Sequence, residues 1–184
     1  WKDIVEGVGD IEISKMTSAI PHPYSQKDAL GWINKNVKKW KEKKKSGYSW
    51  VIELKKGGKV MGGTSLFNFD SNNIHAETGS WINKRYWRKG YILEAKISVL
   101  DFAFNKLKLK KLITCVFTNN EASNKMSQKL GFTFEGTLRK HGKAISTGKI
   151  HDANIYGLLK EEWKKIRPKI IKEVELKIKN DKKP

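Results

Sequence analysis

The stretch that most constrains this chain is a junction where a strand-like pattern turns into a helical one. An apolar, strand-like run from Ile74 to Ile82 leads into it, and a helical pattern from Ile92 to Leu107 follows. The turn between them contains a single glycine, Gly90. A sharp strand-to-helix turn leaves the first backbone N–H groups of the helix without intrahelical acceptors, at the positive end of the helix dipole. The junction is therefore a candidate anion site, best suited to phosphate.

Taken alone, one glycine in a basic turn fits a solvated, lysine-rich turn equally well. The cations Arg85, Arg88 and Lys89 favour the anion site, because charge-assisted hydrogen bonds hold a diphosphate in addition to the backbone donors. A second segment, Asn120–Phe132 with the sequence NEASNKMSQKLGF, also follows directly after an apolar strand pattern.

Together these segments resemble the GNAT superfamily of acyl-CoA N-acyltransferases and, within it, the RimJ/RimL-like group. That group carries a comparable Trp-x-x-Gly-Tyr-x-x-Glu-Ala turn, here beginning at Trp87, and an Asn-x-x-Ser…Lys-Leu-Gly-Phe segment, here beginning at Asn120. The ending Asp152–Trp163 also looks like the group's final strand. The resemblance covers residues 20–163, and the combination of motifs in this order is more specific than any one of them.

Size and composition set outer limits. With 184 residues and 38% hydrophobic content, one domain is the default. No run of about eighteen apolar residues is present, which excludes a membrane-spanning helix. The start at Trp1 shows no signal-peptide pattern, and without a Met it is consistent with a missing native start. The single cysteine, Cys115, lies in a strand pattern, where we expect it to be buried; a reducing, cytoplasmic location fits.

The formal net charge of +19 favours anionic partners: a phosphorylated cofactor, an acidic protein or a nucleic acid. Lysines crowd residues 35–45 and the segment from Lys160 to Pro184. Lysines spread over helices usually form a solvated face, and no helix-turn-helix, zinc-finger or RNA-binding motif is visible. We therefore expect no dedicated nucleic-acid site. No metal-ligand spacing is visible either, and His141 and His151 fit plain surface residues.

The order of patterns predicts an α/β fold, a GNAT-like mixed, mostly antiparallel central sheet flanked by helices in a single domain. Residues 1–20 read as helical, and Ser25 with Asp28 predicts the start of a second helix. A final helix containing Pro168 is expected to bend or restart there. Strands are expected at residues 48–54, 60–67, 74–82, 112–117, 133–139 and 154–159. Gly79 could mark a bulge or a close backbone approach.

We expect one domain over residues 1–163, without the family's first strand. We expect residues 164–184 to form a basic, helical C-terminal tail. The resemblance implies acetyl-CoA, or coenzyme A, as cofactor. It places the diphosphate at the turn and the pantetheine amides along the preceding strand edge. The implied cofactor-binding residues are Trp81, Ile82, Asn83, Trp87, Arg88, Lys89, Gly90, Tyr91, Ile92, Asn120 and Ser123. Ile92 departs from the family's small residue, and its branched side chain could crowd the phosphates.

For catalysis, Glu77 is our candidate base, on the strand that leads into the turn, although it also fits an exposed strand carboxylate. Many family members have Tyr where this chain has Ser127, so Ser123 becomes the candidate acid and Tyr156 a second choice. Asn120 and Ser123 also suit helix capping. In the family the Pro-Tyr loop borders the acceptor pocket, so His22 and Tyr24 are candidate substrate contacts; packing of Tyr24 with an exposed His22 is the alternative.

The resemblance implies an N-acetyltransferase that acts on a primary amine. The leading candidate for this amine is a protein N-terminal α-amine of the ribosomal-protein type. The first alternative is a small amine such as a polyamine, an amino acid or an aminoglycoside, and the second is a non-catalytic module that binds coenzyme A. The expected partners are acetyl-CoA and the amine acceptor. No membrane association is expected, and the protein is expected to be a monomer or a homodimer.

Overall fold

A computed structural model describes residues 1–43 and 46–180 of the chain. Lys44, Lys45 and residues 181–184, which belong to the two lysine-rich segments, lie outside the described residues. Within the described part, no helix is long and apolar enough to cross a membrane.

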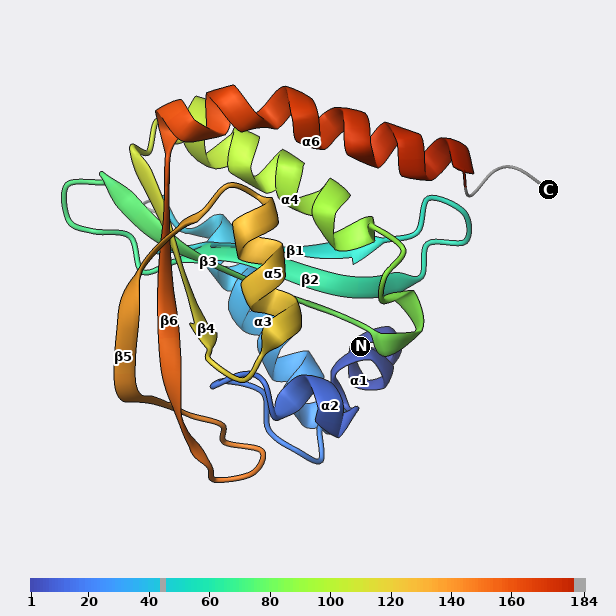
Figure 1. The fold of residues 1–184 in the computed structure, drawn as a ribbon. Helices are drawn as coiled ribbons and strands as arrows, with labels where there is room; N and C mark the ends of the chain where they lie inside the picture. The colour runs from blue at the N-terminus through green and yellow to red at the C-terminus, as the bar shows by residue number, and fades with distance from the viewer. Residues whose placement is uncertain (44–45, 181–184) are drawn as a thin grey trace.

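One mixed, six-stranded sheet with the order β1-β2-β3-β4-β6-β5 forms the centre of the structure, as the sequence predicts (Figure 1). Every neighbouring pair is antiparallel except β3 and β4, which run parallel. The strands are β1 (Tyr48–Glu53), β2 (Val60–Phe67), β3 (His75–Ile82), β4 (Lys111–Phe117), β5 (Thr133–Lys143) and β6 (Ile150–Leu159).

Helices cover both faces of this sheet. Figure 1 shows α4 and α6 on one side and α1, α2 and α3 on the other. The helices are α1 (Lys2–Val8), α2 (Ile11–Ser14), α3 (Gln26–Lys41), α4 (Tyr91–Asp101), α5 (Glu121–Lys129) and α6 (Lys160–Asn180). A short 3-10 helix, η1 (Lys84–Tyr86), precedes α4, and a π-helical segment, η2 (Phe102–Lys106), continues it.

Two hydrophobic clusters fix the layers. The larger one lies between the sheet and α4 and α6, and includes Leu66, Leu100, Leu112 and Trp163, all nearly inaccessible to solvent. The smaller one joins α1 and α3 to the opposite face, where Trp81 packs against it. Burial of these apolar side chains is the main term that holds the helices to the sheet.

The parallel ladder between β3 and β4 is short. It pairs His75 with Lys111, Ala76 with Leu112 and Glu77 with Ile113, and it ends there although β3 runs on to Ile82 and β4 to Phe117. The two strands diverge beyond this point in Figure 1. Thr78–Ile82 therefore pairs with β2 on one side and has no ladder to β4 on the other.

Several local expectations hold and others need correction. Ser25 and Asp28 form the predicted capping box at the start of α3. Gly79 marks no bulge, because the β2–β3 register runs through it without a shift. Residues 1–20 form two short helices instead of one, since Gly9 ends α1. Pro168 lies inside α6, which continues past it to Asn180 without a restart.

Helix α6 also crosses position 163, where the sequence suggested the end of the domain. Its residues Ile170 and Val174 belong to the large cluster, with 2% and 8% of their surface exposed. Asp101 at the end of α4 accepts a bond from the Trp163 indole N–H at 2.9 Å and pairs with the Arg167 guanidinium at 2.7 Å. The segment after residue 163 is thus packed on the domain at least to Val174.

Cys115 is exposed, contrary to the buried role expected of it. Only every second residue of β4 contacts the large cluster: Leu112 and Val116 are buried on that face. Cys115 lies on the opposite face, beyond the end of the β3–β4 ladder. On this face Phe117 is buried in a separate small cluster, but Cys115 is not, so the nearly continuous apolar run does not mean that every residue of the strand is buried.

Candidate functional site

The turn before α4 has the backbone geometry that the sequence predicts for an anion site. Gly90 is the N-cap of α4 and adopts a left-handed conformation with φ +84°, which favours glycine. Arg88, two residues earlier, also has positive φ, at +64°. Among the described residues no side chain caps α4, whereas Ser25 caps α3 and Asn120 caps α5. The first N–H groups of α4 are therefore available to an anion.

The cations of this turn divide into two groups. The Arg85 guanidinium pairs with Glu6 of α1 at 2.7 Å, and the Lys84 ammonium lies 3.7 Å from Asp10. Arg88 and Lys89 have no carboxylate within ion-pair distance in the described part of the chain, and the Lys89 ammonium lies 5.8 Å from the centre of the Tyr86 ring. Arg88 and Lys89, with Gly90, are thus the groups left to face a phosphate.

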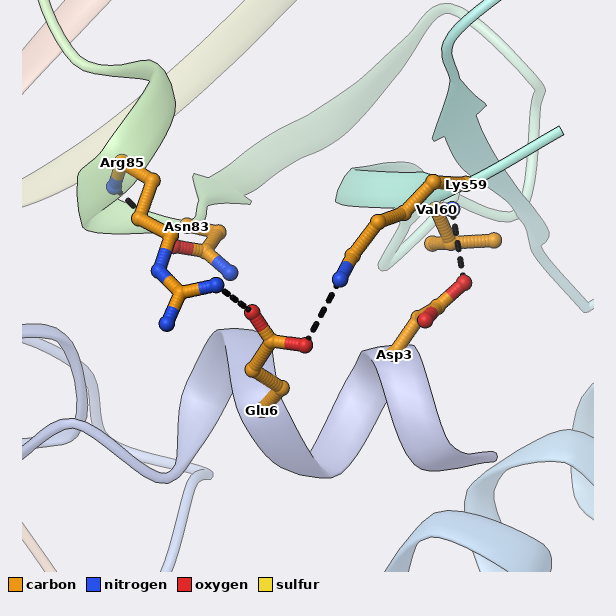
Figure 2. Close-up of polar contacts among 6 residues, drawn as sticks. All are labelled: Asp3, Glu6, Lys59, Val60, Asn83 and Arg85. Carbon is orange, nitrogen blue, oxygen red and sulfur yellow. Dashed lines mark hydrogen bonds and ion pairs between the residues drawn. The ribbon is translucent and has the colours of Figure 1, made fainter. Parts of the chain in front are cut away.

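Figure 2 shows how α1 holds the base of this turn. Glu6 lies between Arg85 and Lys59, whose ammonium it contacts at 2.8 Å. The hydrogen bond from Lys59 is the main reason that the Glu6 pKa lies below its usual value. Asp3 accepts from the backbone N–H of Val60 at 3.0 Å, and the Asn83 side chain accepts from the N–H of Arg85 at 3.0 Å. The first helix therefore fixes both the β1–β2 hairpin and η1.

Two depressions lie outside the β3–β4 opening. One of about 360 Å³ adjoins this polar cluster and is lined by Glu6, Asp10, Asn83, Lys84 and Arg85. The other, of about 800 Å³, lies on the β5–β6 hairpin and is lined by Thr137, Leu138, Arg139, Lys140, His141 and Asp152. The second depression is lined by residues of β5 and β6 alone, and by none of the turn or of β3.

The end of β3 offers fewer free groups than the sequence implied. The Asn83 N–H donates to Met61 on β2 at 2.8 Å, so it points away from β4. The Ile82 carbonyl accepts from the indole N–H of Trp87 at 2.9 Å. The Trp81 side chain packs toward α1, where a Cβ on Gly7 would lie 2.5 Å from it. The part of β3 that remains for an extended ligand is the backbone of Thr78–Ile82 on the β4 side, apart from the Ile82 carbonyl.

Glu77 lies where the β3–β4 ladder ends, on the same face of the sheet as Cys115. The Asn68 side-chain amide donates to its carboxylate at 3.0 Å. Asn68 adopts a positive φ of +49° directly after β2, so the end of the neighbouring strand presents this amide to Glu77. Desolvation first, and then the charge of Glu77, raises the pKa of the Cys115 thiol. Glu77 and Cys115 are therefore close enough to interact.

The second motif forms the start of α5, facing β4 and β6. Asn120 caps the helix, with its side-chain oxygen accepting from the Ser123 N–H at 3.2 Å. Ser127, which stands in the place of the family tyrosine, donates to the Ser123 carbonyl at 3.0 Å. The capping role of Asn120 is confirmed, and the role of Ser123 toward a ligand stays a prediction.

Asn124 is a buried residue that the sequence reasoning missed. Its amide nitrogen donates to the carbonyls of Phe117 and Asn120, at 3.0 and 2.8 Å. Its oxygen accepts from Asn154 at 2.9 Å and from the Tyr156 hydroxyl at 2.8 Å. The hydroxyl of Tyr156, our second choice of acid, is thus engaged inside the protein. An asparagine inside a short helix, where it is a poor helix former, was the available signal.

Lys96 is a second missed residue, a buried lysine on α4. Its ammonium donates to the Thr78 hydroxyl at 2.8 Å and lies 3.4 Å from the Gly79 carbonyl. No carboxylate of the described residues pairs with it, and desolvation lowers its pKa from 10.5 to about 7. The signal in the sequence was its position between Leu93 and Leu100, on the apolar face of the helix.

The two candidate substrate contacts lie near α1 and α3. His22 is exposed, and Tyr24 is half-buried against the smaller cluster. Desolvation is the main cause that raises the Tyr24 pKa, followed by the charge of Asp28. Their role toward a substrate stays a prediction. Among the described residues no group of histidine, cysteine and acidic side chains has the geometry to hold a metal.

Comparison with known proteins gives matches in sequence and in fold. A family model described as an acetyltransferase (GNAT) domain matches residues 1–133. YoaA of Bacillus subtilis (strain 168), an uncharacterized N-acetyltransferase, is 33% identical over 116 residues, which are 63% of this chain and 64% of YoaA. YdaF of the same organism, whose assignment as a ribosomal N-acetyltransferase is itself provisional, is 38% identical over 106 residues, 58% of this chain and 57% of YdaF. The chain thus spans less than two thirds of either relative.

Solved structures share the fold at lower identity. An acetyltransferase of the GNAT family from Bacillus anthracis has a TM-score of 0.73 at 22% identity, covering 88% of this chain and 89% of the other. The microcin C7 self-immunity acetyltransferase MccE, solved in complex with acetyl-CoA and AMP, has a TM-score of 0.72 at 22% identity, covering 86% and 84%.

Proposed function

Because the chain belongs to the acetyltransferase (GNAT) domain family, we propose that it is an N-acetyltransferase that moves the acetyl group of acetyl-CoA to an amine. The observation that carries this proposal is the uncapped start of α4 at Gly90, beside a stretch of β3 that has lost its partner strand. The first feature suits a diphosphate and the second an extended chain with amides. Acetyl-CoA contains both, joined in one molecule, and its reactive thioester lies at the end of the extended chain.

In this proposal the residues divide the work. The N–H groups at the start of α4, with Arg88 and Lys89, bind the diphosphate. The backbone of Thr78–Ile82 aligns the pantetheine arm. Ile92, half-buried in the first turn of α4, lies beside the phosphates. Its apolar side chain offers no hydrogen bond, so the backbone N–H groups bind the phosphates.

Proton transfer falls to side chains on β3 and α5. When bound, acetyl-CoA supplies an activated acetyl thioester. The Glu77 carboxylate accepts the proton that the attacking amine must lose, directly or through water, and the Asn68 amide keeps this carboxylate oriented. The departing thiolate takes a proton, for which Ser123 at the start of α5 is our candidate donor. Together these steps exchange a C–S bond for a C–N bond and return coenzyme A.

For the acceptor we propose a protein N-terminal α-amine, as in the RimJ/RimL-like group. The name of YdaF and the motif pattern support this choice. The net charge of +19 agrees with an acidic protein partner and disfavours polyamines, which it repels. A small-molecule amine is the second candidate. A screen of N-terminal peptides against small amines, read by thiol release, separates the two.

Calorimetry with acetyl-CoA and steady-state turnover test the activity. We expect binding in the micromolar range, and we expect Glu77→Gln to keep this binding while lowering turnover by about 10²-fold or more between about pH 6 and 9. Unchanged turnover of Glu77→Gln would remove the base assignment. Failure of the unaltered chain to bind acetyl-CoA at tens of micromolar would remove the activity itself. Binding without turnover on any amine would favour the non-catalytic module.

A further inference from the structure

Lys177 is a cation that the turn motif does not contain but that the fold brings to the turn. If a Cβ were added to Gly90, it would lie 3.4 Å from the Cδ atom of Lys177, near the end of α6. The two residues are far apart in sequence and adjacent in space. Gly90 is also the residue at which α4 begins with its N–H groups uncapped among the described residues.

The position of Lys177 follows from the face of α6 that packs on the domain. Trp163, Arg167, Ile170, Val174 and Lys177 are spaced by four, three, four and three residues, so they lie along one side of the helix. Trp163, Ile170 and Val174 are buried in the large cluster. Lys177 is the next residue on this side, and it is half-buried, with its aliphatic stem over the turn.

Contacts along its first two thirds hold α6 in this place. Asp101 clamps Trp163 and Arg167 at the end of α4. Ile166 packs so closely on Gly131 that a Cβ there would lie 2.9 Å from it. Glu173 forms an ion pair with Lys129 of α5. Figure 1 shows α6 running along α4, so that its last turns lie above the first turn of α4.

We propose that Lys177 binds the diphosphate of coenzyme A, so that the C-terminal helix completes the phosphate site at Gly90. This assignment rests on the proposed function. Its physical basis is that a lysine stem lying on Gly90 places the ammonium within a few bond lengths of the N–H groups that hold the anion. The partial positive charge of the helix end, about +0.5, and the ammonium then act on the same phosphate.

The competing explanation is that Lys177 only covers Gly90 with its methylene groups while its charge stays in water. Lys177→Met distinguishes the two, because methionine keeps most of the apolar stem and removes the ammonium. Lys172→Met is the matched control: Lys172 is exposed on the solvent side of the same helix. Lys177→Glu reverses the charge at the same place.

The test measures binding of coenzyme A and of 3′-dephospho-coenzyme A by calorimetry, at low salt and at several hundred millimolar salt. We expect Lys177→Met to weaken both ligands equally, by about fivefold at low salt, and to flatten the salt dependence. Lys177→Glu should weaken both further, and Lys172→Met should match the unaltered chain. Circular dichroism confirms that each variant is folded.

Equal affinities for Lys177→Met and the unaltered chain would overturn the assignment while leaving the proposed function intact. A loss seen with coenzyme A and absent with the 3′-dephospho form would overturn the choice of the diphosphate. An unaltered chain that binds neither ligand would overturn the proposed function as well as this assignment.

Discussion

Lys96 places an amine inside the protein with two neutral acceptors and no carboxylate partner among the described residues. Only 5% of its surface is exposed. Burial of a charge without a counter-ion disfavours the charged form, which is why its pKa falls to about 7. The amine of the unfolded chain titrates near 10.5, so between about pH 7 and 10.5 the unfolded chain binds more protons than the folded one.

Because the unfolded chain binds more protons, the free energy of unfolding should rise with pH between about pH 7 and 10.5. The full difference between 10.5 and about 7 corresponds to roughly 5 kcal/mol as an upper bound. Urea unfolding at pH 6.5 and 9.5 measures how much of this rise in the free energy of unfolding occurs between those two pH values. Lys96→Met should be more stable than the unaltered chain at the lower pH. Its free energy of unfolding should change much less between the two pH values. A rise of equal size in Lys96→Met would show that other groups cause it.

Cys115 reports on its neighbour Glu77. Because the carboxylate charge contributes to raising the thiol pKa, Glu77→Gln should increase the rate of Cys115 alkylation near neutral pH, by up to about threefold since desolvation is the larger cause. Iodoacetamide labelling followed by mass spectrometry gives the rate. Glu175→Gln, which alters an exposed carboxylate on α6, is the control and should change nothing.

At the scale of elements, α5 depends on one buried amide. Asn124 joins the helix to the end of β4 and to β6 through hydrogen bonds on both its nitrogen and its oxygen. Asn124→Ala leaves several buried partners unsatisfied, and we expect a loss of about 3 kcal/mol in the free energy of unfolding. Asn124→Asp keeps the oxygen and loses the donor, so it should also destabilise.

Asn34→Ala on the exposed side of α3 is the control, with an expected change within about 0.5 kcal/mol. Urea unfolding with circular dichroism compares the three variants. If Asn124→Ala unfolds like the control, the network around Asn124 contributes little to stability.

The elements themselves could be read from the sequence where their signals are local. The capping box of Ser25 and Asp28, the glycine at position 90 and the apolar periods give the helices and strands within a few residues. The burial of Cys115 was mispredicted, because an apolar strand run does not reveal that the ladder from β3 stops at Glu77. The role of Asn124 depends on β6, thirty residues away, and no local pattern contains it.

At the scale of the whole molecule, α6 decides how much of the chain is one folded unit. Its composition suggested a basic tail after residue 163, yet its apolar side faces α4 and its charged side faces solvent. A chain that ends at Trp163 should therefore lose at least about 3 kcal/mol of stability, because Ile170 and Val174 no longer cover the cluster. A chain that ends at Asn180 is the control. Equal melting temperatures for the two would mean that α6 is dispensable.

The proposed site draws on distant parts of the chain: Gly90 in the middle, Glu77 before it and Lys177 near the end. Local motifs predict roles for the first two, because Gly90 lies in the turn and Glu77 in the strand that enters it. Lys177 could not be found in this way, since its place depends on the path of α6 across α4.

The parting of β3 from β4 has a consequence for unwanted association. A strand at the rim of a sheet exposes its ladder groups along its whole length, and another chain can add there. The stretch Thr78–Ile82 belongs to an inner strand instead, with β2 paired on one side and the β3–β4 ladder ending directly before it on the other. Because only a short part of one side of this inner strand lacks a ladder, we expect a short, extended ligand to pair there more readily than a strand of another folded sheet.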